Sequence, residues 1–167
     1  MDTINVIKER RSIRNFLDKE IPDQILIDLV DCGRLAPTGY NRQPWEFVVI
    51  TDEKLKKEIA NLARYGRFIK DAGACIAVFC NKKEAFTLLE DACAATENII
   101  IAAQNYGLGT CWVNSYQKEH SPKVEKLLNA PEEMVLTTII AVGYHEEPEK
   151  NNRNKKELEE VIVWNEF

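Results

Sequence analysis

Three apolar runs constrain the fold of this chain more than any other feature. They cover Trp45–Ile50, Ala74–Cys80 and Leu136–Val142, and each is short, poor in polar side chains and rich in aliphatic or aromatic ones. Such runs are typical of buried β-strands. Thr110–Val113 is predicted to be a shorter strand, and Val161–Trp164 is a candidate for a last one.

Stretches with the helical spacing of apolar residues alternate with these runs. The longest is rich in small residues and apolar nearly all round in its second half, so we expect it to be buried on several sides, one of which can be another subunit. The alternation predicts an α/β or α+β fold with four or five strands and about five helices. The expected helices run from Asp2 or Thr3 to about Arg11, from Pro22 to near Pro37, from Thr51 to Gly66, from Glu84 to Tyr106, and onward from Ser121.

The turn after the first strand argues against a doubly wound nucleotide-binding fold. Such folds place a glycine-rich phosphate-binding turn there. Here Ile50 is followed by Thr51, Asp52 and Glu53. The acidic side chains would repel a phosphate, so this alternative fails on electrostatic grounds.

Length and charge narrow the class of protein. The 167 residues, 45% of them hydrophobic and 29% charged, predict one globular domain spanning residues 1–167. The formal net charge of −5 argues against nucleic-acid binding through the overall field. No apolar run approaches the roughly 18 residues of a membrane span, and residues 1–16 lack a signal-peptide core, so we expect a cytoplasmic protein with no membrane partner.

The cysteines are odd in number, lie in apolar surroundings and include no C-x-x-C pair. Only two histidines, His120 and His145, could join them as metal ligands. We therefore expect reduced, buried thiols and no metal site. The five are Cys32, Cys75, Cys80, Cys93 and Cys111.

A basic cluster follows the first predicted helix. Arg10, Arg11, Ser12 and Arg14 bring three guanidinium groups and a hydroxyl into five residues of an acidic chain. One guanidinium group can donate two parallel hydrogen bonds to two oxygens of a phosphate, so the cluster is suited to bind a phosphate. The alternative is that Arg10 and Arg11 only complement the dipole at the end of the helix and form surface ion pairs.

A second cluster is the turn from Pro37 to Trp45. Its Asn41 and Gln43 carboxamides each offer a donor and an acceptor, the pattern needed to bind the imide-like edge of a flavin or a nucleobase. The alternative is that Asn41 serves the turn itself, because asparagine tolerates left-handed geometry.

The third cluster runs from Gly107 to Ser115. Its glycines allow a sharp return from the long helix, and its end can present main-chain N–H groups to a flat ligand. The alternative is a simple helix stop followed by a strand.

Together and in this order, the clusters resemble the nitroreductase family of flavin mononucleotide (FMN) dependent oxidoreductases. The resemblance covers nearly the whole chain: R-R-S-I-R-N-F, then A-P-T-G-Y-N-R-Q-P-W-E-F-V-V, then D-A-C-A-A-T-E-N-I-I-I-A-A-Q-N-Y-G-L-G-T-C-W, and a tail with A-V-G-Y and R-N-K-K-E-L-E-E-V. It implies a nitroreductase-like α+β fold, with a mainly antiparallel sheet flanked by helices. It also implies an intertwined homodimer with FMN at the interface.

The resemblance also implies roles for individual residues. The basic cluster matches the segment that binds the FMN phosphate and ribityl chain, and the second cluster matches a turn beside the isoalloxazine that is often supplied by the partner subunit. The third matches the loop whose main chain approaches flavin N5, and the tail matches a basic residue that returns to the phosphate. The implied cofactor-binding residues are Arg10, Arg11, Ser12, Arg14, Pro37, Thr38, Gly39, Asn41, Gln43, Val113, Asn114, Ser115, Arg153 and Lys155.

The expected activity follows from the same resemblance. An open flavin face suits hydride transfer from NAD(P)H to small aromatic acceptors, nitroaromatics or quinones, with the chemistry carried by FMN and no catalytic side chain. Cys111 and His120 are interpreted as a strand thiol and a surface imidazole. The alternatives are dehalogenation or oxygen-dependent flavin chemistry on the same fold, and a non-catalytic FMN-binding module.

Overall fold

The computed structural model describes residues 2–146 and 155–167, and a four-stranded antiparallel sheet lies at its centre. The strands are β1 (Trp45–Ile50), β2 (Ala74–Asn81), β3 (Gly109–Asn114) and β4 (Met134–Gly143). Their order is β1-β2-β4-β3, and every pairing is antiparallel. The predicted α+β class and its antiparallel sheet are therefore confirmed.

The central strands explain the apolar runs. β2 and β4 are buried along almost their whole length, because helices cover both faces of the sheet. A strand buried on both faces has no polar side to present, so its sequence is continuously apolar instead of alternating. Residues Ile76 and Ile140 pair across these two strands and are fully buried.

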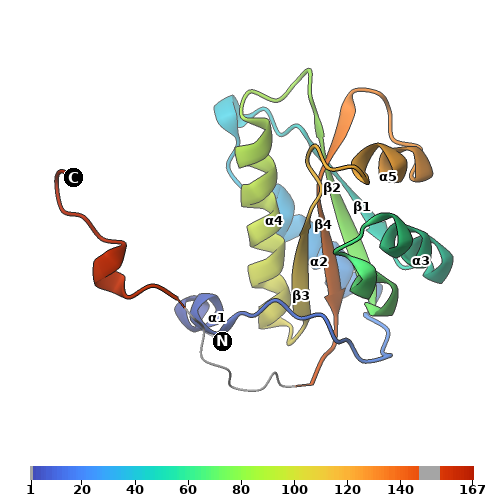
Figure 1. Cartoon of the computed structure of the whole chain (residues 1–167), viewed down its shortest axis with the longest axis horizontal. Helices are drawn as coiled ribbons and strands as arrows, with labels where there is room; N and C mark the ends of the chain where they lie inside the picture. Colours follow the sequence, from blue (N-terminus) through green and yellow to red (C-terminus); the bar gives the residue numbers. More distant parts are fainter. Residues whose placement is uncertain (1, 147–154) are drawn as a thin grey trace.

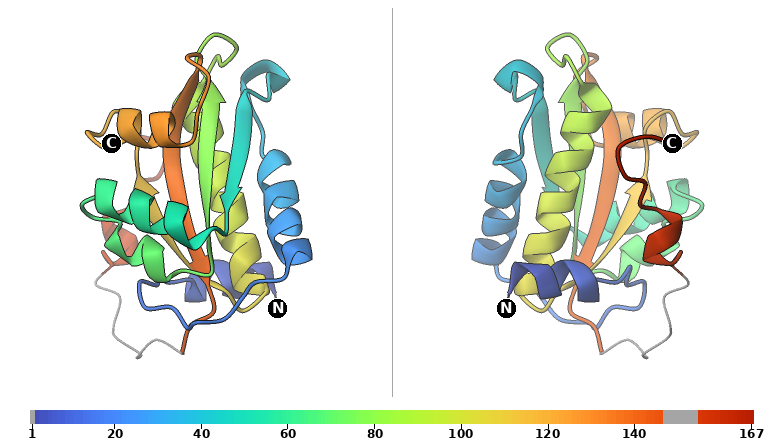
Figure 2. Two further views of the ribbon diagram at one scale, coloured as in Figure 1. Left: turned by 90° about the vertical axis from the view of Figure 1, so that its right-hand side faces the viewer. Right: turned by 90° about the vertical axis from the view of Figure 1, so that its left-hand side faces the viewer.

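Helices of the described residues cover both faces of the sheet (Figures 1 and 2). One apolar cluster joins the sheet to α2 (Asp23–Arg34) and α4 (Leu88–Asn105), and a second joins it to α3 (Glu53–Leu62), α5 (Ser121–Leu127) and the short helix η2 (Arg67–Asp71). Helix α1 (Thr3–Glu9) packs against α4. None of the described helices is both long and apolar enough to cross a membrane. The described residues also form the 3₁₀ turns η1 (Gly39–Asn41) and η3 (Leu158–Glu160).

Helix α4 begins four residues later than the periodicity predicts. Asn81 accounts for the delay, because its side-chain oxygen accepts the N–H of Lys83 at 3.0 Å and its carbonyl accepts the N–H of Ala85 at 3.0 Å. These bonds fold the chain into a turn after β2 and so compete with helix formation. The helix starts only at Leu88.

The end of the chain differs from prediction. Val161–Trp164 forms no strand; a single 3₁₀ turn precedes it, and all the residues from Lys155 to Phe167 are exposed. Figure 1 shows this segment apart from the sheet. A strand needs a hydrogen-bonded neighbour, and no described strand lies beside these residues.

Candidate functional site

The basic segment is attached to the edge of the sheet. Ser12 forms a parallel bridge with Thr110 of β3, and the main-chain N–H of Ile13 donates to the Thr110 carbonyl at 2.8 Å. The side chain of Ile13 is buried, which anchors the segment further. Ser12 and Arg14, both exposed, therefore lie beside β3, the strand of the third predicted cluster.

Arg10 faces the long helix. Its Nε lies 3.3 Å from a carboxylate oxygen of Glu97 on α4. Arg11 is half-buried beside it in the sequence. The surface ion pair that was the alternative role for Arg10 is thus present, and any phosphate bound there would compete with the Glu97 carboxylate.

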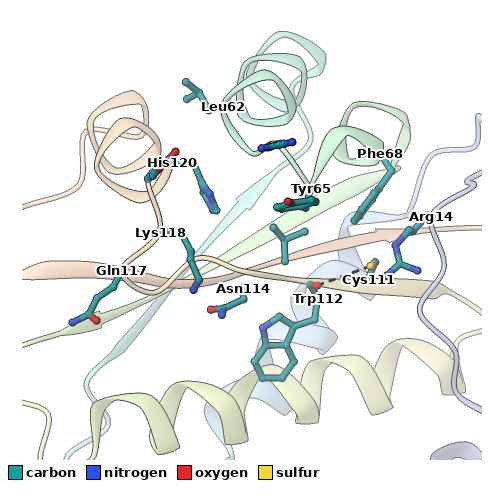
Figure 3. A pocket seen from close by; sticks show the side chains of 13 residues that line it. Arg14, Leu62, Tyr65, Phe68, Cys111, Trp112, Asn114, Gln117, Lys118 and His120 are labelled. Atoms are coloured by element: carbon teal, nitrogen blue, oxygen red, sulfur yellow. Dashed lines mark hydrogen bonds between the residues drawn. The ribbon is translucent and has the colours of Figure 1, made fainter.

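A cavity of about 590 Å³ opens on the side of β3 that faces α3 and α5 (Figure 3). That volume is typical of a small-molecule site. The aromatic rings of Tyr65 and Phe68 contribute to its lining, and the Arg14 guanidinium lies 5.8 Å from the centre of the Phe68 ring. The Trp112 ring points to the α4 side of the sheet (Figure 3). The lining residues are Arg14, Leu62, Arg64, Tyr65, Phe68, Cys111, Trp112, Val113, Asn114, Gln117, Lys118, Glu119 and His120.

The main chain of β3 supplies polar groups at this site. β3 is an edge strand of the described sheet, paired with β4 on one side. In an antiparallel ladder alternate residues direct both their N–H and C=O groups the same way. Because the Thr110 carbonyl points outward to Ile13, the N–H and C=O groups of Trp112 and Asn114 also point toward the open edge.

His120 lies in the wall of the cavity instead of on an open surface. Its Nε2 is 3.0 Å from the hydroxyl oxygen of Ser115, a fully buried residue. Burial, with a smaller contribution from the Lys118 charge, lowers the pKa of His120 below its ordinary value. His120 directly precedes α5, as the interpretation of an imidazole near a helix start expects, but it is half-buried instead of fully exposed, and its lowered pKa favours the uncharged form at neutral pH.

The second cluster lies elsewhere. Residues 37–43 pack at the amino-terminal end of α4, where the Tyr40 ring meets the Phe86 ring edge to face at 4.7 Å. The basic segment lies near the opposite end of α4 (Figure 1). Within one chain the cavity is therefore lined by Arg14, Val113 and Asn114 but by none of Pro37, Thr38, Gly39, Asn41 and Gln43.

The remaining implied residues are outside the cavity. Ser115 lies directly behind it, hydrogen-bonded to His120. Lys155 is exposed in the terminal segment. Arg153 lies outside the described residues.

Four of the five cysteines are at least half-buried, but Cys93 is exposed and corrects the expectation of five buried thiols. All five are free. Burial raises the pKa of Cys75 and that of Cys80 to about 12. Within residues 2–146 and 155–167, no group of three or more histidine, cysteine or acidic side chains is placed to hold a metal ion.

The aromatic residues that line the cavity, Tyr65 and Phe68, were not predicted from the sequence. Tyr65 and Phe68 come from the segment between α3 and β2, next to Gly66, and nothing in their local pattern distinguishes them from loop residues. Only the tertiary packing of this segment against β3 brings them to the cavity. The signal appears only in the structure, where the Tyr65 side chain is 82% exposed.

Comparison with known proteins identifies close relatives of this chain. The model of the nitroreductase family matches residues 7–66 and 62–144. A protein of Methanothermobacter thermautotrophicus, provisionally named NADH dehydrogenase/NAD(P)H nitroreductase, is 31% identical over 86% of this chain and 78% of its own length. An iodotyrosine deiodinase of Thermotoga neapolitana is 30% identical over 95% of each chain.

Solved structures share the fold. A Bacteroides thetaiotaomicron protein with the same provisional name superposes with a TM-score of 0.92 at 29% identity, over 99% of this chain and 98% of that one. A provisionally named nitroreductase of Desulfovibrio desulfuricans, solved in complex with FMN, superposes with a TM-score of 0.83 at 27% identity, over 100% and 98% of the two chains.

Proposed function

Because this chain belongs to the nitroreductase family, we propose that it transfers hydride from NAD(P)H through bound FMN to a nitroaromatic or quinone-type acceptor. It is an NAD(P)H-dependent flavin oxidoreductase with FMN as its cofactor. Bound FMN supplies the two-electron chemistry, so no side-chain nucleophile or general base is required. The protein's part is to bind, orient and screen the flavin.

The single observation that carries this proposal is the cavity beside β3. Its volume of about 590 Å³ and its aromatic lining fit a flat ring system, and the outward N–H of Asn114 is a donor suited to a ring nitrogen. Arg14 contributes a fixed positive charge at the same site. The residues present therefore fit an anionic flavin.

We assign Val113 and Asn114 to the ring, Ser115 to the layer behind them, where it holds His120, and the basic segment to the phosphate. Neutralising a phosphate of nearly two negative charges on a chain of net charge −5 requires local cations. Arg10, Arg11, Ser12 and Arg14 are the groups we assign to it: Ser12 is bridged to β3, Arg10 lies beside Glu97 of α4, and Arg14 lines the cavity. Arg153 and Lys155 are assigned as additional phosphate ligands from the tail.

A homodimer completes the proposed site. Within one chain no residue of the turn at 37–43 lines the cavity, so we assign its Asn41 and Gln43 to the flavin bound by the partner subunit. Exposed apolar residues support such a partner: Leu35 lines a groove between α1, α2 and α4, Ile4 and Ile7 are exposed on α1, and the tail adds Trp164. Burying them requires a second surface.

The decisive test is steady-state oxidation of NADH and NADPH by the purified protein, with a nitroaromatic compound and then a quinone as acceptor. The proposal predicts a yellow protein with flavin absorption and acceptor-dependent turnover with at least one reductant. A protein that binds FMN without oxidising either reductant would be a non-catalytic FMN module instead. A colourless protein that takes up no added FMN would contradict the proposal as a whole.

Reductive dehalogenation is a second candidate, favoured by the 30% identity with the iodotyrosine deiodinase. The same flavin site would serve it. Product analysis distinguishes the two: iodide release from an iodinated phenol by the reduced protein supports dehalogenation, whereas hydroxylamine formation from a nitroaromatic compound supports nitroreduction.

A further inference from the structure

A buried carboxylate lies beneath the turn at residues 37–43. Asp91, in the first turns of α4, is only 2% exposed. Its Oδ1 accepts the main-chain N–H of Gly39 at 3.0 Å and the hydroxyl of Thr87 at 2.8 Å. Its Oδ2 has no hydrogen-bond partner among the described residues. Burial of a carboxylate is costly when it is only half satisfied, so the position calls for an explanation beyond packing.

The turn above Asp91 has an unusual backbone. Tyr40, Asn41 and Gln43 have φ values of 53°, 55° and 51°, in the left-handed region that residues other than glycine rarely adopt. Such conformations persist where the surroundings hold them in place, and they concentrate at ligand-binding sites. Part of the restraint is internal, since the Gln43 main-chain N–H donates to the Thr38 hydroxyl at 3.1 Å and the Gln43 side chain donates to the Asn41 carbonyl at 3.3 Å. These bonds link residues of the turn to each other, and a separate contact fixes the turn to the rest of the protein.

Helix α4 supplies that contact. The contact between Gly39 and the helix is so close that a Cβ added at Gly39 would lie 2.4 Å from the Thr87 hydroxyl oxygen. Asp91 joins both partners, because one oxygen accepts from Gly39 and from Thr87. The first residue of the strained turn is thus tied to the helix by a single carboxylate oxygen.

We propose that Asp91 is a positioning residue for flavin binding: by holding Gly39 and Thr87 it sets the direction in which Asn41 and Gln43 present their carboxamides. This inference rests on the proposed function, in which that turn contacts FMN. Asp91 does not itself line the cavity, so it acts through the turn. The proposal also explains why the carboxylate sits on α4, since this helix lies along the proposed subunit boundary and can place the turn against the partner's site.

The test is an FMN titration of the apoprotein, followed by flavin fluorescence and by visible circular dichroism, which reports the surroundings of the bound ring. D91A removes the acceptor and should raise the Kd for FMN about tenfold, the expected scale for a lost charge-assisted hydrogen bond. D91N retains an oxygen that accepts from Gly39 and Thr87, so it should restore most of the affinity and the wild-type dichroism. T87V should have a smaller effect, and it should add nothing in the D91A background, because both changes break the same unit.

The control variant is D52A. The Asp52 side chain also accepts a main-chain N–H, that of Leu55 at 2.7 Å, but at the start of α3 and away from the turn. It should lower the midpoint of urea unfolding without changing the Kd for FMN. A role of Asp91 in stability alone would make D91A resemble D52A.

The outcomes separate the two levels of inference. If the wild-type protein binds no FMN, the proposed function and this inference both fail. If the wild-type protein binds FMN and D91A binds it equally well, the inference alone is overturned. If D91A does not fold, the T87V variant decides the question. An unchanged FMN affinity and an unchanged dichroism in T87V also overturn the proposed positioning role of Asp91.

Discussion

The main-chain N–H of Ile13 donates to the carbonyl of Thr110 at 2.8 Å, and this bond joins the basic amino-terminal segment to the edge of the sheet. Without this hydrogen bond, Arg14 would be one of several basic side chains on an unattached surface segment. With it, the guanidinium lines the same cavity as Asn114. A local charge cluster and a distant strand thereby become parts of one site.

The double variant R10A/R14A should fold but purify without flavin colour. Each charge-assisted hydrogen bond to the phosphate contributes about 1.5–3 kcal/mol to FMN binding, so the loss of one weakens the affinity for FMN about ten- to a hundredfold. Far-UV circular dichroism checks the fold and the flavin absorption checks occupancy. The charge-matched control R34A/K57A removes two cations outside the site and should remain yellow; full occupancy of R10A/R14A would refute the phosphate assignment.

Dilution to the monomer should release FMN. A site that takes its turn from the second subunit cannot stay complete after dissociation, so flavin loss should follow the monomer fraction as the protein concentration falls. Analytical ultracentrifugation with detection at both protein and flavin wavelengths measures the two together. A stable, flavin-loaded monomer is the result that this arrangement does not allow.

Thiol reactivity should divide the cysteines by burial. The thiolate is the reactive form, and burial raises the pKa of Cys75 and Cys80 to about 12, so neither should react at pH 8 in the folded protein. Cys93 is exposed and should react first with a disulfide reagent. Unfolding in guanidinium should make all five thiols reactive. If the C93S variant keeps the fast phase of the thiol reaction, that phase does not come from Cys93.

The stability of the protein should depend on the ionisation of His120. Its folded-state pKa is lowered, chiefly by burial, below the ordinary 6.5. Between those two values the unfolded chain binds a proton that the folded protein does not, so the free energy of unfolding falls as the pH drops from about 6.5 toward the folded-state pKa. Urea unfolding of the wild type and of H120Q between pH 5 and pH 8 measures this, and the variant should have the shallower pH dependence.

The two central strands were predictable because β2 and β4 are buried on both faces and so leave continuous apolar runs. The start of α4 was not, since a single asparagine, Asn81, hydrogen-bonds the main chain and delays the helix. The chemistry of the basic cluster was also readable from residue types. The cavity walls were not, because Tyr65 and His120 reach them only through packing between segments far apart in sequence.

The turn and the basic segment lie near opposite ends of α4 (Figure 1), so in the proposed dimer each flavin site would combine the basic segment of one chain with the turn of the other. Two defective variants, R14A and N41A, should then repair one another when unfolded together and refolded as a mixture. A mixed dimer would contain one flavin site with both substitutions and one flavin site with neither. If the two variants pair at random in an equal mixture, about a quarter of all flavin sites would be intact. If two inactive variants recover turnover when they are refolded together, each active site must contain residues from both chains.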